Sequence, residues 1–218
     1  LGNALRPGSV LATGAEVGEE VGYVETLEAI RPHYDAAIER AHRANRGGRI
    51  QHGVGVASMW YGIGTTTGEK PSYADLALLP SGRVAVYAGV TDAGQGSDFL
   101  LRRVAADALG VSLARIDLVR GDTDLTQDTG SCTGSRVSFY VGNAVRLAAG
   151  SLRDAILEAA ALELHTSPRS LDLTDQGVQP RGMPGRTMSL ANLGQRLEAR
   201  GVQLRQTGTY VPDTSFLD

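Results

Sequence analysis

The sequence predicts an α+β fold in which helices pack on an antiparallel or mixed sheet. Segments with a helical spacing of apolar residues alternate with short segments of strand-like alternation along the chain. Short turns such as Pro80-Ser81-Gly82 join neighbouring strand segments, which indicates antiparallel hairpins. The 218 residues are 42% hydrophobic, so the chain can bury a core. A doubly wound parallel sheet is the alternative architecture.

The amino-terminal part is expected to contain a linker, a broken helix and a strand. Residues 1–20 are interrupted by glycine and proline and are predicted to be a lead-in or linker. Val21–Asn45 has a helical period, and Pro32 is predicted to split it into a short helix and a second helix from about His33. Gly53–Gly64 alternates like a strand.

The central part is expected to form a hairpin followed by a helix and a strand. Tyr73–Leu79 and Arg83–Val90 form the two hairpin strands. Ser97–Leu109 is the helix, with its first residue as the N-cap and Gly110 as its end. Ala114–Val119 is the next strand.

A long helix is predicted from Ser138 to His165. Gly142 and Gly150 within it lower helix stability, which suggests close packing against a neighbouring element. The other predicted elements are a turn at Gly121–Asp124, a strand-turn-strand at Leu171–Val178, a capped helix at Ser189–Arg200 and a strand at Val202–Tyr210.

The composition limits the classes of function. A net charge of −3 argues against a nucleic-acid-binding surface, and no apolar run is long enough to span a membrane. We expect no signal peptide at the start of the chain. One cysteine excludes an internal disulfide and a metal site made only of cysteines. The 28 glycines beside 5% aromatic residues suit loops that approach a ligand closely.

Two loops of small, hydrogen-bonding residues are the candidate binding site. They are Asp92–Ser97 and Asp128–Arg136, and each leads into a segment with a helical period. Backbone N–H groups at helix N-termini, together with the helix dipole, favour negative charge. The loops therefore predict a large, oxygen-rich, anionic ligand held mainly by backbone.

The sequence gives less support to other kinds of functional site. No G-x-G-x-x-G opens a helix and no lysine stands where a phosphate-binding P-loop needs one, which excludes both nucleotide motifs. Ser131 or Ser135 could be a hydrolase nucleophile only with a positioned base, and neither His52 nor His165 has a recognisable relation to them. Cys132 alone cannot hold an iron–sulfur cluster.

The order and spacing of several short motifs carry a family resemblance. The motifs are GQGS, AADALGV-LARIDLV-GDTD, TGS-TGSR-S and GNAV, flanked by NALRPGS-LATG, RGGRIQHGVGVASMWYGIG and GTYVPDTSFLD. Together they resemble the molybdenum hydroxylases, the family of xanthine dehydrogenase, aldehyde oxidase and the large subunit of carbon monoxide dehydrogenase. The resemblance implies that residues 21–218 are the first half of a molybdopterin-binding domain.

The resemblance also implies which residues contact the cofactor. Gly134 occupies the position that places a backbone group close to the metal, and Cys132 stands where relatives often have threonine. Arg136 stands where some relatives have a small apolar residue, and it either reaches a phosphate or is a surface charge. The implied cofactor-binding residues are Gly94, Gln95, Gly96, Cys132, Thr133, Gly134, Ser135, Arg136 and Val137.

The implied activity is oxidative hydroxylation of an aldehyde or an N-heterocycle with water as the oxygen source. The implied cofactor is molybdopterin, as a cytosine dinucleotide, with molybdenum. Electrons would leave through 2Fe–2S clusters and FAD on other domains or subunits. The implied partners are the remainder of the molybdopterin subunit, the iron–sulfur and flavin subunits and a small-molecule substrate, all in the cytoplasm.

No residue of this chain is assigned a catalytic role. The resemblance implies that the catalytic glutamate and the substrate-pocket residues lie outside the chain, so the chain alone is expected to be inactive. The alternative from another class is a non-catalytic ligand-binding or subunit-assembly module that retains the family fold.

Overall fold

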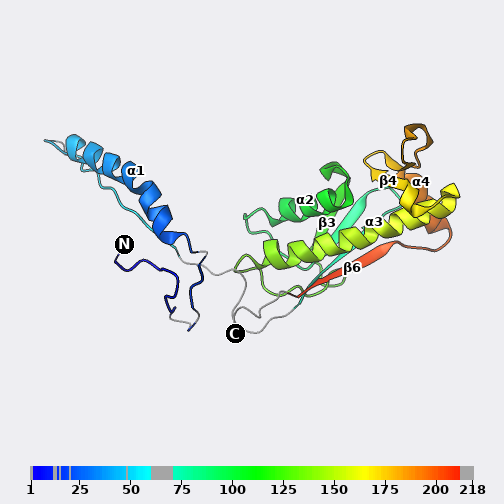
Figure 1. Cartoon of the computed structure of the whole chain (residues 1–218), viewed down its shortest axis with the longest axis horizontal. Helices are drawn as coiled ribbons and strands as arrows, with labels where there is room; N and C mark the ends of the chain where they lie inside the picture. Colours follow the sequence, from blue (N-terminus) through cyan, green and yellow to red (C-terminus); the bar gives the residue numbers. More distant parts are fainter. Residues whose placement is uncertain are drawn as a thin grey trace. The chain divides into compact units, whose positions relative to one another are not determined.

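The computed structural model describes residues 2–11, 14, 16–19, 21–47, 49–59 and 71–211. The chain divides between residues 60 and 61 into two compact units, and each is described by itself (Figure 1). The boundary expected after residue 20 stays a prediction. None of the helices in the described ranges combines the length and the apolar character needed to cross a membrane.

One helix, α1 (Tyr23–Ala44), dominates the first unit. The predicted break at Pro32 is wrong, because the helix continues through the proline. Pro32 only removes the N–H that would bond the carbonyl of Glu28. Glu28 is exposed and Ala41 is the helix's buried residue, so water can satisfy that carbonyl. A proline on a hydrated helix costs less than one inside a packed core.

The strand predicted at Gly53–Gly64 is wrong for residues 53–59, which belong to no strand. Residues 60–64 lie outside the described part of the chain. An alternating sequence becomes a strand only beside a partner that completes its hydrogen bonds. The described sheets contain no neighbour for residues 53–59.

The main sheet of the second unit is mixed. Its strands are β1 (Ser72–Leu78), β2 (Val84–Ala88), β3 (Ile116–Arg120) and β6 (Arg205–Tyr210), in the order β3-β2-β1-β6. Strand β1 is antiparallel to β2 and β6, while β2 and β3 are parallel. The α+β prediction and its central hairpin are confirmed, and the doubly wound alternative is wrong.

Two helices, α2 (Ser97–Leu109) and α3 (Gly142–Leu164), cover one face of this sheet (Figure 1). Their apolar side chains form one core with those of the strands, including the register pair Leu76 and Val86. Helix α2 begins and ends as predicted. The long predicted helix instead starts with a π-helical turn, Val137–Val141, before α3.

The close packing between α3 and the sheet depends on a glycine of strand β6. A Cβ atom on Gly208 of β6 would lie 2.0 Å from the Ala144 carbonyl oxygen of α3, so only glycine fits there. The close packing predicted at Gly142 and Gly150 is wrong. A Cβ on Gly150 would meet no atom within 4 Å, and one on Gly142 would meet only the Val137 carbonyl oxygen of the preceding π-helical turn, at 3.8 Å.

The remaining predicted elements are confirmed with shifted ends. A second hairpin consists of β4 (Leu171–Thr174) and β5 (Gly177–Pro180). Helix α4 (Leu190–Ala199) follows, and the Ser189 hydroxyl accepts a bond from the Asn192 N–H at 3.2 Å, as a cap does.

Candidate functional site

The loop before α2 is organised by its own aspartate. The Asp92 Oδ1 atom accepts from the N–H groups of Gly94 at 2.8 Å and Gly96 at 3.2 Å, and Oδ2 accepts from the Asp98 N–H at 3.0 Å. The predicted cap at Ser97 is wrong, because Gly96, which has no side chain, holds the N-cap position. These backbone bonds, that from Asp98 first, lower the pKa of Asp92.

This arrangement gives the N–H groups of the first loop an acceptor within the chain. The N–H groups of Gly94, Gly96 and Asp98 already serve a carboxylate of the chain itself. The expectation that they bind an anionic ligand stays a prediction. A fixed negative charge at the start of α2 also offsets the positive end of the helix dipole.

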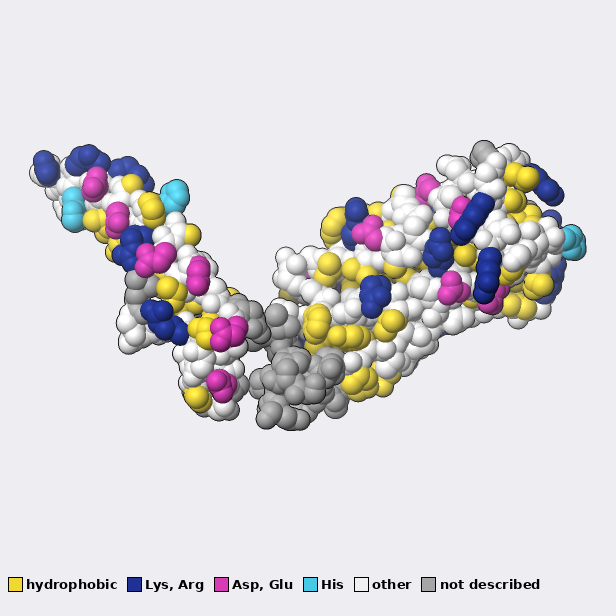
Figure 2. All heavy atoms as spheres, viewed as in Figure 1, with side chains coloured by type: hydrophobic (Ala, Val, Ile, Leu, Met, Phe, Trp, Pro, Cys, Tyr) yellow, Lys and Arg dark blue, Asp and Glu magenta, His cyan; other side chains and the backbone are white. Residues whose placement is uncertain are grey.

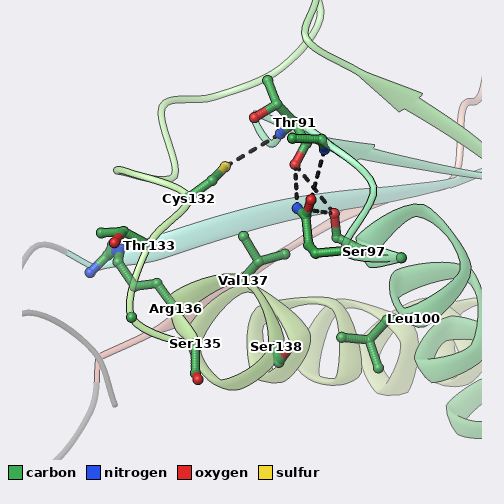
Figure 3. Close-up of a pocket in the computed structure, with 13 residues that line it drawn as sticks. Thr91, Ser97, Leu100, Cys132, Thr133, Ser135, Arg136, Val137 and Ser138 are labelled. Atoms are coloured by element: carbon green, nitrogen blue, oxygen red, sulfur yellow. Dashed lines mark hydrogen bonds between the residues drawn. The ribbon is translucent and has the colours of Figure 1, made fainter. Parts of the chain in front are cut away.

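The Gln95 amide braces the same loop. Its Oε1 atom accepts from the Ala93 N–H at 2.7 Å, and Nε2 donates to the Thr91 carbonyl and the Ser97 hydroxyl, both at 2.9 Å. Figure 3 shows the bonds that converge between Thr91 and Ser97. An amide oxygen accepts two bonds, so a further bond to a ligand is compatible with this brace. The predicted cofactor contact of Gln95 stays a prediction.

The bases of the two loops are joined by backbone. Gly89 pairs with Asp128 in an isolated parallel bridge, and the Thr129 hydroxyl donates to the Gly89 carbonyl at 2.7 Å. A Cβ on Gly89 would lie 2.2 Å from the Gln127 carbonyl oxygen, so a larger residue would push the loops apart. Nearer the tips of the loops, the Thr91 N–H donates a hydrogen bond to the Cys132 sulfur at 3.3 Å (Figure 3).

Arg136 holds the second loop from inside. Its side chain is only 3% exposed. Nη2 donates to the Ser72 hydroxyl of β1 and to the Thr129 carbonyl, each at 2.9 Å. The guanidinium carbon lies 4.6 Å from the centre of the Tyr140 ring, a cation–π contact. The surface-charge alternative is wrong, while a contact with the cofactor stays a prediction.

The two loops enclose a cavity of about 590 Å³, which we call the loop pocket. All the predicted cofactor-binding residues except Gly94 line it, namely Gln95, Gly96, Cys132, Thr133, Gly134, Ser135, Arg136 and Val137. The lining also includes residues that were not assigned to the cofactor, namely Thr91, Ala93, Ser97, Leu100 and Ser138. The volume is typical of sites for small molecules and cofactors.

The chemistry of the loop pocket suits a neutral, hydrogen-bonding group. Its lining contains hydroxyls, one amide and backbone groups, with apolar surface from Leu100 and Val137. No carboxylate lines it, and its one cation, Arg136, has its guanidinium bonded to β1 and the loop backbone. A pterin ring offers matching donors and acceptors, so the residues present fit a molybdopterin.

The organising role of Asp92 was missed in the sequence. The available signal was an aspartate two residues before a glycine and shortly before a helix, which is typical of Asx-turns and caps. Asp128 carries the same signal, since its Oδ1 atom accepts from the Gly130 N–H at 2.8 Å. In the described part of the chain, no group of three or more His, Cys, Asp or Glu side chains is placed to hold a metal.

Comparisons with known proteins agree on one family. A model of the molybdopterin cofactor-binding domain matches residues 29–217. A putative xanthine dehydrogenase molybdenum-binding subunit of Escherichia coli is 31% identical over 175 residues, which are 79% of this chain and 23% of that protein. An aldehyde oxidoreductase of Megalodesulfovibrio gigas is 33% identical over 153 residues, 69% of this chain and 16% of that protein.

Solved structures show the same fold. The aldehyde oxidoreductase of Desulfovibrio desulfuricans matches 96% of this chain with a TM-score of 0.65 and 27% identity, and the match covers 20% of that chain. Quinoline 2-oxidoreductase of Pseudomonas putida 86 matches 96% of this chain with a TM-score of 0.63 and 22% identity, over 29% of its length. The chain thus spans less than a third of these proteins.

Proposed function

Because this chain belongs to the molybdopterin cofactor-binding domain family of the xanthine dehydrogenases, aldehyde oxidoreductases and CO dehydrogenases, we propose that its two loops bind the molybdopterin of a molybdenum-dependent hydroxylase. The observation that carries the proposal is the loop pocket, where residues from two distant loops converge on one cavity. The pocket's polar lining has no carboxylate, and its one cation, Arg136, is bonded within the protein, which supports contact with the pterin ring rather than with a phosphate.

Each loop has its own part in this binding. Gln95 and Ser97 belong to a loop whose shape is fixed before the cofactor arrives, which lowers the entropic cost of binding. Thr133 and Ser135 would supply hydroxyls from the second loop, and the backbone at Gly134 would hold the end of the cofactor that carries the metal. When bound, the cofactor supplies the redox chemistry. The residues of this chain bind and orient it and keep water from its edge.

The reaction we propose is oxidative hydroxylation of an aldehyde or an N-heterocycle, with water as the oxygen source. The cofactor is molybdopterin as its cytosine dinucleotide. In the proposed enzyme, this chain works with the rest of the molybdopterin subunit and with 2Fe–2S clusters and FAD on other domains or subunits. The assembly is cytoplasmic. Relatives described as an aldehyde oxidoreductase and a nicotine 6-hydroxylase large subunit support these two substrate classes. Catalytic residues come from outside this chain.

Elemental analysis of the native complex purified through this chain tests the proposal. Stoichiometric molybdenum, together with the fluorescence of oxidised pterin, is the expected result. A folded complex with neither molybdenum nor pterin would contradict it. That result would favour the second candidate, a non-catalytic assembly module that retains the fold.

A further inference from the structure

A second cavity, of about 730 Å³, lies at the far end of α3 from the loop pocket. We call it the hairpin pocket; among the residues that line it are Leu164, His165, Arg169, Arg181, Met183 and Arg186. Val137 of the loop pocket and Leu164 lie roughly 40 Å apart along the helical segment, at about 1.5 Å per residue. The cofactor in the loop pocket therefore does not account for this site.

Cations dominate the hairpin pocket. Its lining holds Arg169, Arg181 and Arg186 and no carboxylate, although the whole chain has a net charge of −3. Figure 2 shows Lys and Arg side chains at the end of the unit that carries β4 and α4. Asp172, outside the lining, pairs with Arg181 at 3.0 Å. The carboxyl end of α3 contributes about half a negative charge. Together these offset about one and a half of the three positive charges.

The guanidinium groups of Arg169 and Arg186 are accessible to solvent. Arg169 and Arg186 are both exposed. Arg169 is the middle residue of the 3-10 turn Pro168–Ser170, and Arg186 is the last residue of the 3-10 turn Pro184–Arg186. Holding like charges together at a surface is unfavourable unless an opposite charge completes them. Arginine is the side chain whose planar fork matches a carboxylate.

The apolar residues that line the hairpin pocket favour a protein partner over a small anion as its ligand. Met183 is 55% exposed and lines the hairpin pocket beside Leu164 and Pro180. Exposed methionine and arginine side chains together are typical of the centre of protein–protein interfaces. An inorganic phosphate would use neither the volume nor the apolar surface.

We propose that the hairpin pocket is a docking surface for an acidic segment of another subunit of the same assembly. The inference rests on the proposed function for the existence of that assembly. Relatives described as a molybdenum-binding subunit and as a subunit of a dehydrogenase complex are consistent with it. Charge complementarity at such a surface mainly sets the association rate and the choice of partner.

The test uses the full-length subunit and its purified partner subunits. Arg169→Glu combined with Arg186→Glu is expected to weaken association about ten- to hundredfold, because the surface would then repel acidic groups. The matched control combines Arg103→Glu with Arg146→Glu, which changes the net charge equally at exposed positions elsewhere in the same unit. The control is expected to associate like the wild type. Arg169→Gln with Arg186→Gln, checked by thermal unfolding, guards against misfolding.

Two results would overturn the docking proposal. One is unchanged association of the Glu and Gln double variants. The other is equal weakening in the control. Tight binding of inorganic phosphate to the wild type, lost in the Gln variant while assembly persists, would assign a small-anion site instead. Molybdenum content is measured on the same samples, so failure of the cofactor assignment is seen separately from failure of docking.

Discussion

The two loops of the loop pocket begin alike and are stabilised differently. Asp92 and Asp128 each accept a bond from the backbone N–H two residues later, at 2.8 Å in both loops. The first loop is then closed by its own Asp92 and Gln95 side chains. The second depends on Arg136, which bonds to Ser72 of a distant strand. One loop is therefore shaped by local sequence, and the other by the folded sheet.

The largest expected effect comes from Gly89, where the loops join. Gly89→Ala places a Cβ 2.2 Å from a backbone oxygen and should lower the free energy of unfolding by about 3 kcal/mol, with loss of bound cofactor. Urea unfolding of the cofactor-free full-length subunit measures the loss. Gly150→Ala is the control, because its Cβ meets no atom within 4 Å, and it should stabilise α3 by about 0.5–1 kcal/mol. Equal effects of the two substitutions would refute the close junction.

The next largest effect is expected at Arg136. Arg136→Met removes the bond to Ser72 and the contact with Tyr140, while the Thr129 carbonyl keeps its bond from the Ser72 hydroxyl. The expected loss is about 2 kcal/mol in the same urea experiment, with a smaller loss for Arg136→Lys. A neutral result for Arg136→Met would mean that the second loop does not depend on the sheet.

Gln95→Ala should act on the cofactor more than on the fold. The substitution removes three loop bonds, and losing about 1.4 kcal/mol of binding corresponds to about tenfold faster cofactor release. Molybdenum retained after timed gel filtration gives the rate. Gln176→Ala, in the exposed turn between β4 and β5, is the control and should release cofactor like the wild type. Identical rates of cofactor release from both variants would show that Gln95 does not contribute to cofactor binding.

The smallest effect is expected for Asp92→Asn, and it should depend on pH. The pKa of Asp92 is lowered from an ordinary value of 3.8, so the charged form stabilises the fold above about pH 4. That contribution is lost as the pH falls through the lowered pKa. Melting temperatures of wild type and variant should differ at neutral pH and converge in acid below the folded-state pKa. A difference that does not change with pH would show that the carboxylate charge is unimportant.

Local signals in the sequence predicted most of the second unit. Helix α2 was recognised between a polar loop and Gly110, because both of its ends are set by nearby residues. The inward direction of Arg136 could not be recognised, because Ser72 lies 64 residues away in the sequence. The close packing predicted from Gly150 was also wrong, because it depends on which element lies opposite. The close contact is instead made by Gly208 of β6 against Ala144 and Ala148 of α3.

The first unit shows the same limit. The alternation at residues 53–59 predicted a strand, yet a strand also needs a neighbour that its own sequence does not specify. Pro32 is compatible with a helix because the carbonyl it leaves unbonded is at a hydrated surface. Sequence patterns report local preference, whereas burial and partners decide between the outcomes.

Hydrogen–deuterium exchange on the full-length complex, with and without cofactor, tests the central claim most directly. The cofactor-free sample comes from a host that cannot make molybdopterin. We predict that the cofactor slows exchange in residues 91–97 and 131–138 together and leaves residues 165–186 unchanged. Unchanged exchange in both loops, in a complex that contains stoichiometric molybdenum, would show that the cofactor is held elsewhere.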